Sequence, residues 1–243
     1  MRKHIPNTIT LMNLLCGSLG VIFTLKGQPQ TAFLLMLGAS VFDWCDGLAA
    51  RLLGAYSDIG KELDSLCDMV SFGLLPALML CCAMAVSNPC TVLSYVPLFI
   101  ALMSALRLAK FNIDERQHES FLGLPTPACA ILCGALASFI DAAPESWLAG
   151  LASSYWFIPV LSVCLGLLLV SEIPMFSFKF GKGIHSDKAT AITRIVFLSL
   201  SVLSIPAVLL AGLHWTLIPL LVFVLYILIN IFLAITRRNN SVA

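Results

Sequence analysis

The chain is built largely from apolar runs that are long enough to cross a lipid bilayer. About 20 apolar residues span the hydrocarbon core as a helix, and hydropathy predicts eight such segments. They lie near residues 8–25, 30–53, 62–86, 92–111, 125–142, 153–171, 190–211 and 215–235. With 59% hydrophobic and 11% charged residues, the chain is not a soluble domain, which is ~45–50% apolar and ~25% charged. We therefore predict an all-α fold, a polytopic helical bundle in the membrane.

The basic residues are distributed unevenly between the two ends of the predicted spans. On a model with eight spans, all but one of the 14 Lys and Arg residues lie on the same side. These are Arg2, Lys3, Arg51, Lys61, Arg107, Lys110, Arg116, Lys179, Lys182, Lys188, Arg194, Arg237 and Arg238; Lys26 lies opposite. Because basic loops stay in the cytoplasm, both termini are expected there, with the bundle in the inner (cytoplasmic) membrane. The net charge of +1 offers no general attraction for nucleic acid.

Four aspartates at the facing ends of the second and third spans are the strongest functional candidates. Asp43 and Asp46 are three residues apart and Asp64 and Asp68 are four apart, so each pair projects from one helix face. A short loop makes the two spans antiparallel neighbours, so we expect the four carboxylates to converge just inside the membrane surface. One carboxylate in the bilayer costs ~3 kcal/mol, and four together would repel one another. A cation is therefore expected among them.

Divalent metal ions fit this requirement best. Carboxylate oxygens suit Mg²⁺ or Mn²⁺, and four could hold two ions, which activate an attacking oxygen and stabilise a leaving one. The alternative, that these residues cap helices or lie in a hydrated loop, does not account for four on two facing helices. Gly47 and Ala50 follow Asp43 and Asp46 by four residues, so small residues extend the same face. They leave room for a ligand or for close helix packing.

The same residues form a long spaced signature that resembles that of the CDP-alcohol phosphatidyltransferases. The pattern, DGxxAR-x8-GxxxDxxxD with an Asp three residues upstream, is complete here in Asp43, Asp46, Gly47, Ala50, Arg51, Gly60, Asp64 and Asp68. The stretch Pro6 to Thr10, with Asn13, resembles the start of that family. Residues 105–112, 121–128 and 170–174 resemble its serine-using branch. We therefore expect a catalytic membrane domain over residues 1–180, with residues 181–243 adding a C-terminal pair of helices to the same bundle.

The resemblance implies transfer of the phosphatidyl group of CDP-diacylglycerol to the hydroxyl of L-serine, releasing CMP, in a homodimer. It implies two divalent ions, one held by Asp43, Asp46 and Asp64 and the other by Asp43, Asp64 and Asp68. Asp68 would be the general base, and attack on the donor would be direct. The donor would be bound by Gly47, Ala50, Arg51 and Gly60, with Asn7 and Thr10 facing the same cavity.

The acceptor is expected to meet Arg107 and Lys110, which are three residues apart near the same membrane surface. A guanidinium binds carboxylate or phosphate well, although such a pair can instead anchor a helix on anionic lipid. Because only Arg107 and Lys110 are well placed near the acidic residues, an uncharged or zwitterionic acceptor is favoured over a phosphorylated one. Glycerol 3-phosphate, inositol phosphate and choline remain alternative acceptors. From a different class, a cation transporter also uses intramembrane carboxylates. Transporter sites lie near the midplane, often between inverted repeats, and neither feature is predicted here.

Overall fold

The computed structural model describes residues 4–87, 92–113, 121–175 and 188–242. Within these ranges the chain is helical apart from connecting turns and two short strands. The longer helices are α1 (His4–Leu25), α2 (Pro29–Leu53), α3 (Asp58–Asp68), α4 (Leu75–Ser87), α5 (Leu98–Ile113), α6 (Thr126–Ala142), α8 (Phe157–Leu169), α9 (Lys188–Leu210) and α10 (Leu217–Val242). The shorter elements are the π-helix η1 (Met69–Leu74), the 3₁₀ helix η2 (Val92–Tyr95), α7 (Trp147–Ala152), β1 (Phe121–Leu122) and β2 (Pro174–Met175). The predicted all-α fold is thus confirmed.

Local sequence explains how α2 ends and α3 begins. Gly54, which follows the last residue of α2, adopts a left-handed conformation (φ 57°), which is favourable for glycine at a helix C-terminus. Ser57 then caps α3, and its Oγ accepts a hydrogen bond from the Gly60 N–H at 3.1 Å. The reversal between these two residues makes α2 and α3 antiparallel, while α1 packs against both helices.

The third helical segment is continuous from Asp58 to Ser87, but its middle is π-helical. The π-helix η1 begins directly after Asp68 and packs against α1 and α5. A Cβ built on Gly17 of α1 would lie 2.8 Å from the Ser71 Cα, so only a glycine allows this approach of the two backbones. The Ser71 hydroxyl donates a hydrogen bond to the Asn13 carbonyl at 3.2 Å in the same contact.

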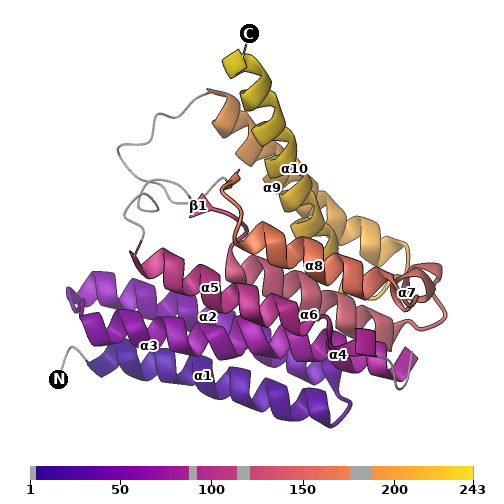
Figure 1. The fold of residues 1–243 in the computed structure, drawn as a ribbon, viewed down its shortest axis with the longest axis horizontal. Helices are drawn as coiled ribbons and strands as arrows, with labels where there is room; N and C mark the ends of the chain where they lie inside the picture. Colours follow the sequence, from indigo (N-terminus) through magenta and orange to yellow (C-terminus); the bar gives the residue numbers. More distant parts are fainter. Residues whose placement is uncertain (1–3, 88–91, 114–120, 176–187, 243) are drawn as a thin grey trace.

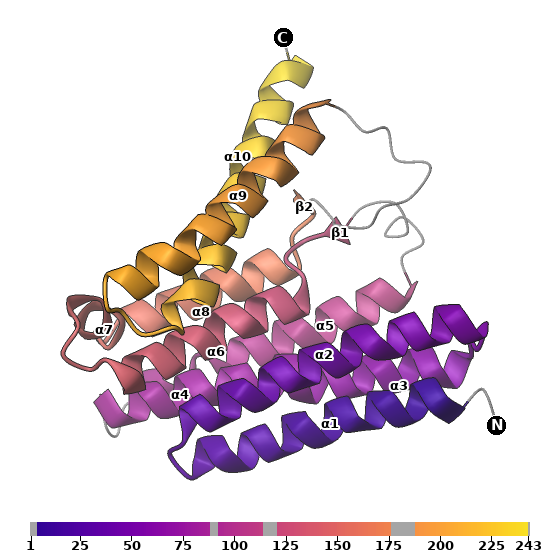
Figure 2. The ribbon, with the colours of Figure 1, turned by 180° about the vertical axis from the view of Figure 1, so that it is seen from behind.

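The core lies where α6 packs against α2, α4 and α10. Large side chains such as Phe33, Phe72 and Phe139 are fully or almost fully buried there. The segments that flank α6 and α8 are tied together by the antiparallel pairing of β1 with β2, in which Phe121 lies opposite Met175. Figures 1 and 2 show α1–α6 and α8 lying alongside one another, with the short α7 at one end of this group, whereas α9 and α10 run together and lean away from the other helices.

The helices have the dimensions of membrane spans. Five helical segments in the described ranges are long and apolar enough to cross a membrane: His4–Leu25, Pro29–Leu53, Asp58–Ser87, Val92–Ile113 and Leu217–Thr236. Three shorter apolar helices coincide with the remaining predicted segments: Thr126–Ala142, Phe157–Leu169 and Ile195–Leu210. The chain is therefore a helical membrane protein, while the count of eight crossings and the cytoplasmic termini remain predictions. Arg2, Lys3, Arg116, Lys179, Lys182 and the domain boundary at residues 180–181 lie outside the described residues.

Candidate active site

Three of the four predicted aspartates meet in space. One carboxylate oxygen from each of Asp43, Asp64 and Asp68 lies within 4.8 Å of the other two. Asp43 comes from α2, and Asp64 and Asp68 come from successive turns of α3. Asp46 lies one turn after Asp43 on α2, is 7% exposed and does not belong to this closest group. The same-face spacing in the sequence is thus realised as a cluster between two helices.

Helix α1 supplies uncharged hydrogen-bond donors to Asp46 and to this cluster. The Thr10 hydroxyl donates to Asp46 Oδ2 at 2.6 Å, and the Asn13 amide Nδ2 donates to Asp68 Oδ1 at 3.1 Å. The sequence predicts that Thr10 faces the donor, and Thr10 lines the cavity described below. The sequence predicts no role for Asn13, because its contact with Asp68 depends on how α1 packs against α3. No pattern within one helix reports such a contact.

The donor atoms of the cluster fit a hard divalent cation. All of them are carboxylate oxygens, which Mg²⁺ and Mn²⁺ prefer. Asp64 Oδ1 is buried and has no hydrogen-bond partner, a costly state for an anionic oxygen unless a cation binds it. An ion among these three oxygens would draw them closer together, because adjacent ligands of a six-coordinate Mg²⁺ lie about 3 Å apart at its ~2.1 Å bond length.

A cavity of about 480 Å³ opens beside the cluster. Its walls come from the start of α1, the end of α2, the α2–α3 turn and the start of α3. The lining residues are Pro6, Thr10, Asp46, Gly47, Ala50, Ala55, Tyr56, Ser57, Asp58, Gly60, Lys61 and Asp64. Since Asp46 and Asp64 belong both to this wall and to the acidic residues, a ligand in the cavity would reach the cluster.

The predicted donor-binding residues fall into two groups. Gly47, Ala50 and Gly60 line the cavity, and a Cβ built on Gly47 would meet nothing within 4 Å. Asn7 lies next to Gly60, since its Oδ1 is 3.2 Å from a Cβ built there, but it is not itself a lining residue. Arg51 is exposed, and its Nε donates to the Gly47 carbonyl at 2.9 Å. The structure thus places Arg51 at the end of α2, outside the cavity lining.

Sequence reasoning missed several lining residues in the α2–α3 connection. Tyr56, Ser57 and Asp58 belong to the spacer of the signature, whose positions are not specified by type, and Lys61 follows Gly60. The only signal for them was their position between two fixed parts of the signature. The Lys61 ammonium donates to the Asn112 carbonyl at 2.8 Å, so this residue also connects α3 to the end of α5.

The structure separates the two predicted acceptor-binding residues. Arg107 is only 7% exposed; its guanidinium donates to the Thr126 hydroxyl at 2.7 Å, and its Nε is buried without a partner. Lys110 is exposed on the same helix, because a shift of three residues turns a side chain by about 60° around the axis.

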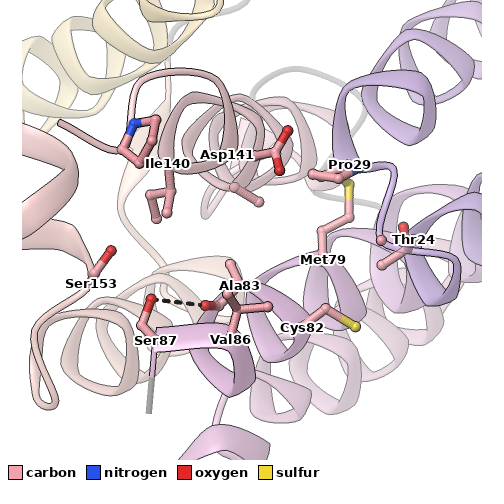
Figure 3. A pocket seen from close by; sticks show the side chains of 13 residues that line it. Thr24, Pro29, Met79, Cys82, Ala83, Val86, Ser87, Ile140, Asp141 and Ser153 are labelled. Atoms are coloured by element: carbon pink, nitrogen blue, oxygen red, sulfur yellow. Dashed lines mark hydrogen bonds between the residues drawn. The ribbon is translucent and has the colours of Figure 1, made fainter. Parts of the chain in front are cut away.

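A second cavity of about 280 Å³ lies at the other ends of α1, α4 and α6. Thr24 lines it, about 21 Å along α1 from Thr10 at 1.5 Å per residue. Figure 3 shows Met79, Cys82 and Val86 on one wall and Ile140 with Asp141 on another. None of the predicted site residues reaches this cavity. Its one lining carboxylate, Asp141, accepts a hydrogen bond from Gln30 at 3.1 Å.

Comparison with known proteins identifies the family to which the chain is similar. The family model described as CDP-alcohol phosphatidyltransferase matches residues 3–168. A relative from Methanocaldococcus jannaschii named CDP-diacylglycerol–serine O-phosphatidyltransferase is 32% identical over 223 residues, covering 91% of both chains. Two mycobacterial relatives carry the same name. The Mycobacterium leprae protein is 32% identical over 85% of this chain and 67% of its own length. The Mycobacterium tuberculosis protein is 37% identical over 70% of this chain, which spans only 60% of that relative.

Proposed function

Because the chain belongs to the CDP-alcohol phosphatidyltransferase family, we propose that it transfers the phosphatidyl group of CDP-diacylglycerol to the hydroxyl of L-serine. The products are phosphatidylserine and CMP. The observation that carries this proposal is the group of three carboxylates within 4.8 Å of one another beside a large cavity. The names of the relatives support serine as the acceptor.

The four aspartates are proposed to hold two Mn²⁺ or Mg²⁺ ions, with the ligand sets that the family signature implies. When bound, the ions would offset the negative charge of the donor pyrophosphate and of the departing CMP. The unpaired Asp64 Oδ1 supports this proposal. Thr10 and Asn13 would hold Asp46 Oδ2 and Asp68 Oδ1 and so orient these two carboxylates toward the ions, as hydrogen-bond partners commonly orient metal ligands.

The donor nucleotide is proposed to occupy the cavity of about 480 Å³. Gly47, Ala50 and Gly60 have little or no side chain, so the pyrophosphate can approach the backbone at these positions. Arg51 and Asn7, which lie beside the cavity, would contact the nucleotide once it is bound. The acyl chains of the donor would extend into the lipid, because the cavity lies between helices whose outer faces are apolar.

Asp68 is proposed to be the general base. In this step the serine hydroxyl gives its proton to the Asp68 carboxylate, the serine oxygen bonds to the phosphorus next to diacylglycerol, and the pyrophosphate P–O bond breaks to release CMP. A positioned base contributes about 10²–10⁴ to the rate. Direct attack requires no phosphatidyl-enzyme intermediate.

The acceptor carboxylate is proposed to bind Arg107, which is buried and whose Nε lacks a partner. Lys110 would act at longer range, from the exposed side of α5. A single buried cation fits the one carboxylate of serine better than the two negative charges of a phosphorylated acceptor.

The site is proposed to face the cytoplasm from the inner membrane, in a homodimer whose protomers each cross the membrane eight times. The segment from Asp58 to Ser87 has 30 residues and is about 45 Å long, longer than the ~30 Å hydrocarbon core. Its first turns contain Asp58, Lys61 and Glu62, so this end would extend into the headgroup region. Water-soluble serine and CMP could then reach and leave the site.

The direct test is CMP release from CDP-diacylglycerol by the purified full-length protein in detergent micelles. We expect release to require L-serine together with Mn²⁺ or Mg²⁺. Activity with glycerol 3-phosphate but not with serine would contradict the proposed acceptor, and activity that persists after removal of divalent ions by EDTA would contradict the metal site.

A further inference from the structure

The Asn13 side chain connects α1 to the proposed general base. It is completely buried, and its Nδ2 donates to Asp68 Oδ1 at 3.1 Å. Nothing in the signature between Asp43 and Asp68 includes this residue. Its amide nevertheless lies against one particular oxygen of Asp68.

The backbone around Asn13 is held firmly against the helix that carries Asp68. The Asn13 carbonyl accepts a hydrogen bond from Ser71 of η1, just three residues after Asp68. One turn further along α1, Gly17 allows close contact with the same serine. The distance between the amide and the carboxylate is thus set by a packed helix contact and not by a loop.

The amide orientation leaves its oxygen without a partner. An ionised carboxylate only accepts hydrogen bonds, so Nδ2 must face Asp68, and Asn13 Oδ1 is buried with no hydrogen bond. Among the described residues, the buried side-chain atoms that share this state are Asp64 Oδ1, Ser104 Oγ and Arg107 Nε. All four residues lie on α1, α3 or α5, the helices that meet at η1. They comprise acceptor oxygens and one cationic donor.

We infer that Asn13 positions Asp68 and also recognises the amine of the acceptor, which makes it a specificity-determining residue for 2-amino alcohols. Its Nδ2 occupies one oxygen of Asp68, so the other oxygen faces the reacting hydroxyl. Its Oδ1 accepts a hydrogen bond from the acceptor ammonium, a group with three donors. Arg107 binds the carboxylate of the same molecule. This inference rests on the proposed function, because it concerns the acceptor of that reaction.

The test compares Asn13→Ala and Asn13→Leu with the wild-type protein in the CMP-release assay. Loss of a side chain that orients a carboxylate typically costs 10–100-fold in activity, so we expect kcat with serine to fall by about that factor. The KM for CDP-diacylglycerol should change by less than about twofold. The preference for L-serine over 3-hydroxypropionate, which lacks the amine, should fall by about tenfold in kcat/KM, because one contact is lost.

Thr24→Val is the matched control. Thr24 lies on the same helix and is 3% exposed, and within the described part of the chain its hydroxyl bonds only to the Gly20 carbonyl. Both the rate and the preference for serine should be unchanged. If Asn13→Leu does not elute as a monodisperse protein, Asn13→Ser, which keeps a shorter hydroxyl at this position, gives the same comparison.

The outcomes separate this inference from the proposed function. An active wild type whose Asn13 variants keep full kcat and the full preference for serine would overturn the inference alone. A lower kcat with an unchanged preference would overturn the contact with the amine. Wild-type protein that releases no CMP in response to serine would overturn the proposed function, and the inference with it.

Discussion

At the scale of residues, Thr10 and Asn13 share one face of α1, and they bind the carboxylates of Asp46 and Asp68, respectively. The convergence of the aspartates was predictable, since spacings of three and four place side chains on one helix face. The partners of these carboxylates were not predictable in the same way. They come from α1, and no periodic signal within α1 states which helix its polar positions will meet. The same limit applies to Arg107, whose partner Thr126 lies across a helix contact.

Asp68→Asn should abolish most of the activity while leaving the fold intact. The amide keeps the size of the carboxylate but can no longer take the serine proton, so we expect CMP release to fall by about 10²–10⁴. The measurement is kcat at saturating serine, with binding of CDP-diacylglycerol followed separately. A variant that retains more than a tenth of wild-type kcat would rule out Asp68 as the base.

Thr126→Val should weaken both stability and serine binding. It removes the hydroxyl that accepts a hydrogen bond from the buried Arg107 guanidinium, so we expect a loss of about 1–3 kcal/mol in the free energy of unfolding and a severalfold higher KM for serine. Thermal unfolding and steady-state kinetics measure the two effects. Thr236→Val is the control, because that hydroxyl is exposed and, among the residues that the structure describes, bonds only to the Phe232 carbonyl of its own helix. Equal effects of both substitutions would contradict the role given to Arg107.

At the scale of elements, the approach of α1 to η1 supports the whole site. The eight apolar segments predicted the helices well, because each helix must bury its backbone polar groups internally in lipid. The π-helical stretch after Asp68 had no sequence signal, since it arises where α1, α5 and α6 pack around the segment. The sequence did not predict that Lys110 is exposed for a related reason. Arg107 and Lys110 are three residues apart on α5 and lie near each other, but the first is buried and the second is exposed.

Gly17→Ala should destabilise the protein, whereas Gly38→Ala should not. The new Cβ at residue 17 would lie 2.8 Å from the Ser71 Cα, and such overpacking costs about 1–3 kcal/mol. At residue 38 the nearest atom, Cys16 Sγ, is 3.9 Å away, and alanine favours a helix interior over glycine by roughly 0.5–1 kcal/mol. Thermal unfolding in one detergent compares the two. Equal melting temperatures would mean that the contact between α1 and η1 can relax.

At the scale of the whole molecule, the uneven distribution of basic residues and the position of the site predict that both termini lie in the cytoplasm. With an even number of crossings, a fluorescent protein fused to the C-terminus should fold in the cytoplasm and fluoresce, while alkaline phosphatase fused there should be inactive. Alkaline phosphatase fused after Lys26, on the opposite side, should be active. An active C-terminal phosphatase fusion would contradict the count of eight crossings.

The π-helical turn also separates chain length from alignment within the third span. A residue removed between Met69 and Leu74 would let this stretch return to ordinary helical geometry, because a π-turn contains one residue more. The flanking helices would keep their relative rotation, since the wide turn takes up one residue without changing their phase. A residue removed from the regular helix of α4 would instead rotate the parts on either side by about 100°, the angle between successive residues of an α-helix. The tolerated position for a one-residue deletion therefore lies in the wide turn, between a polar half that faces the ligand and an apolar half that is buried in the bundle.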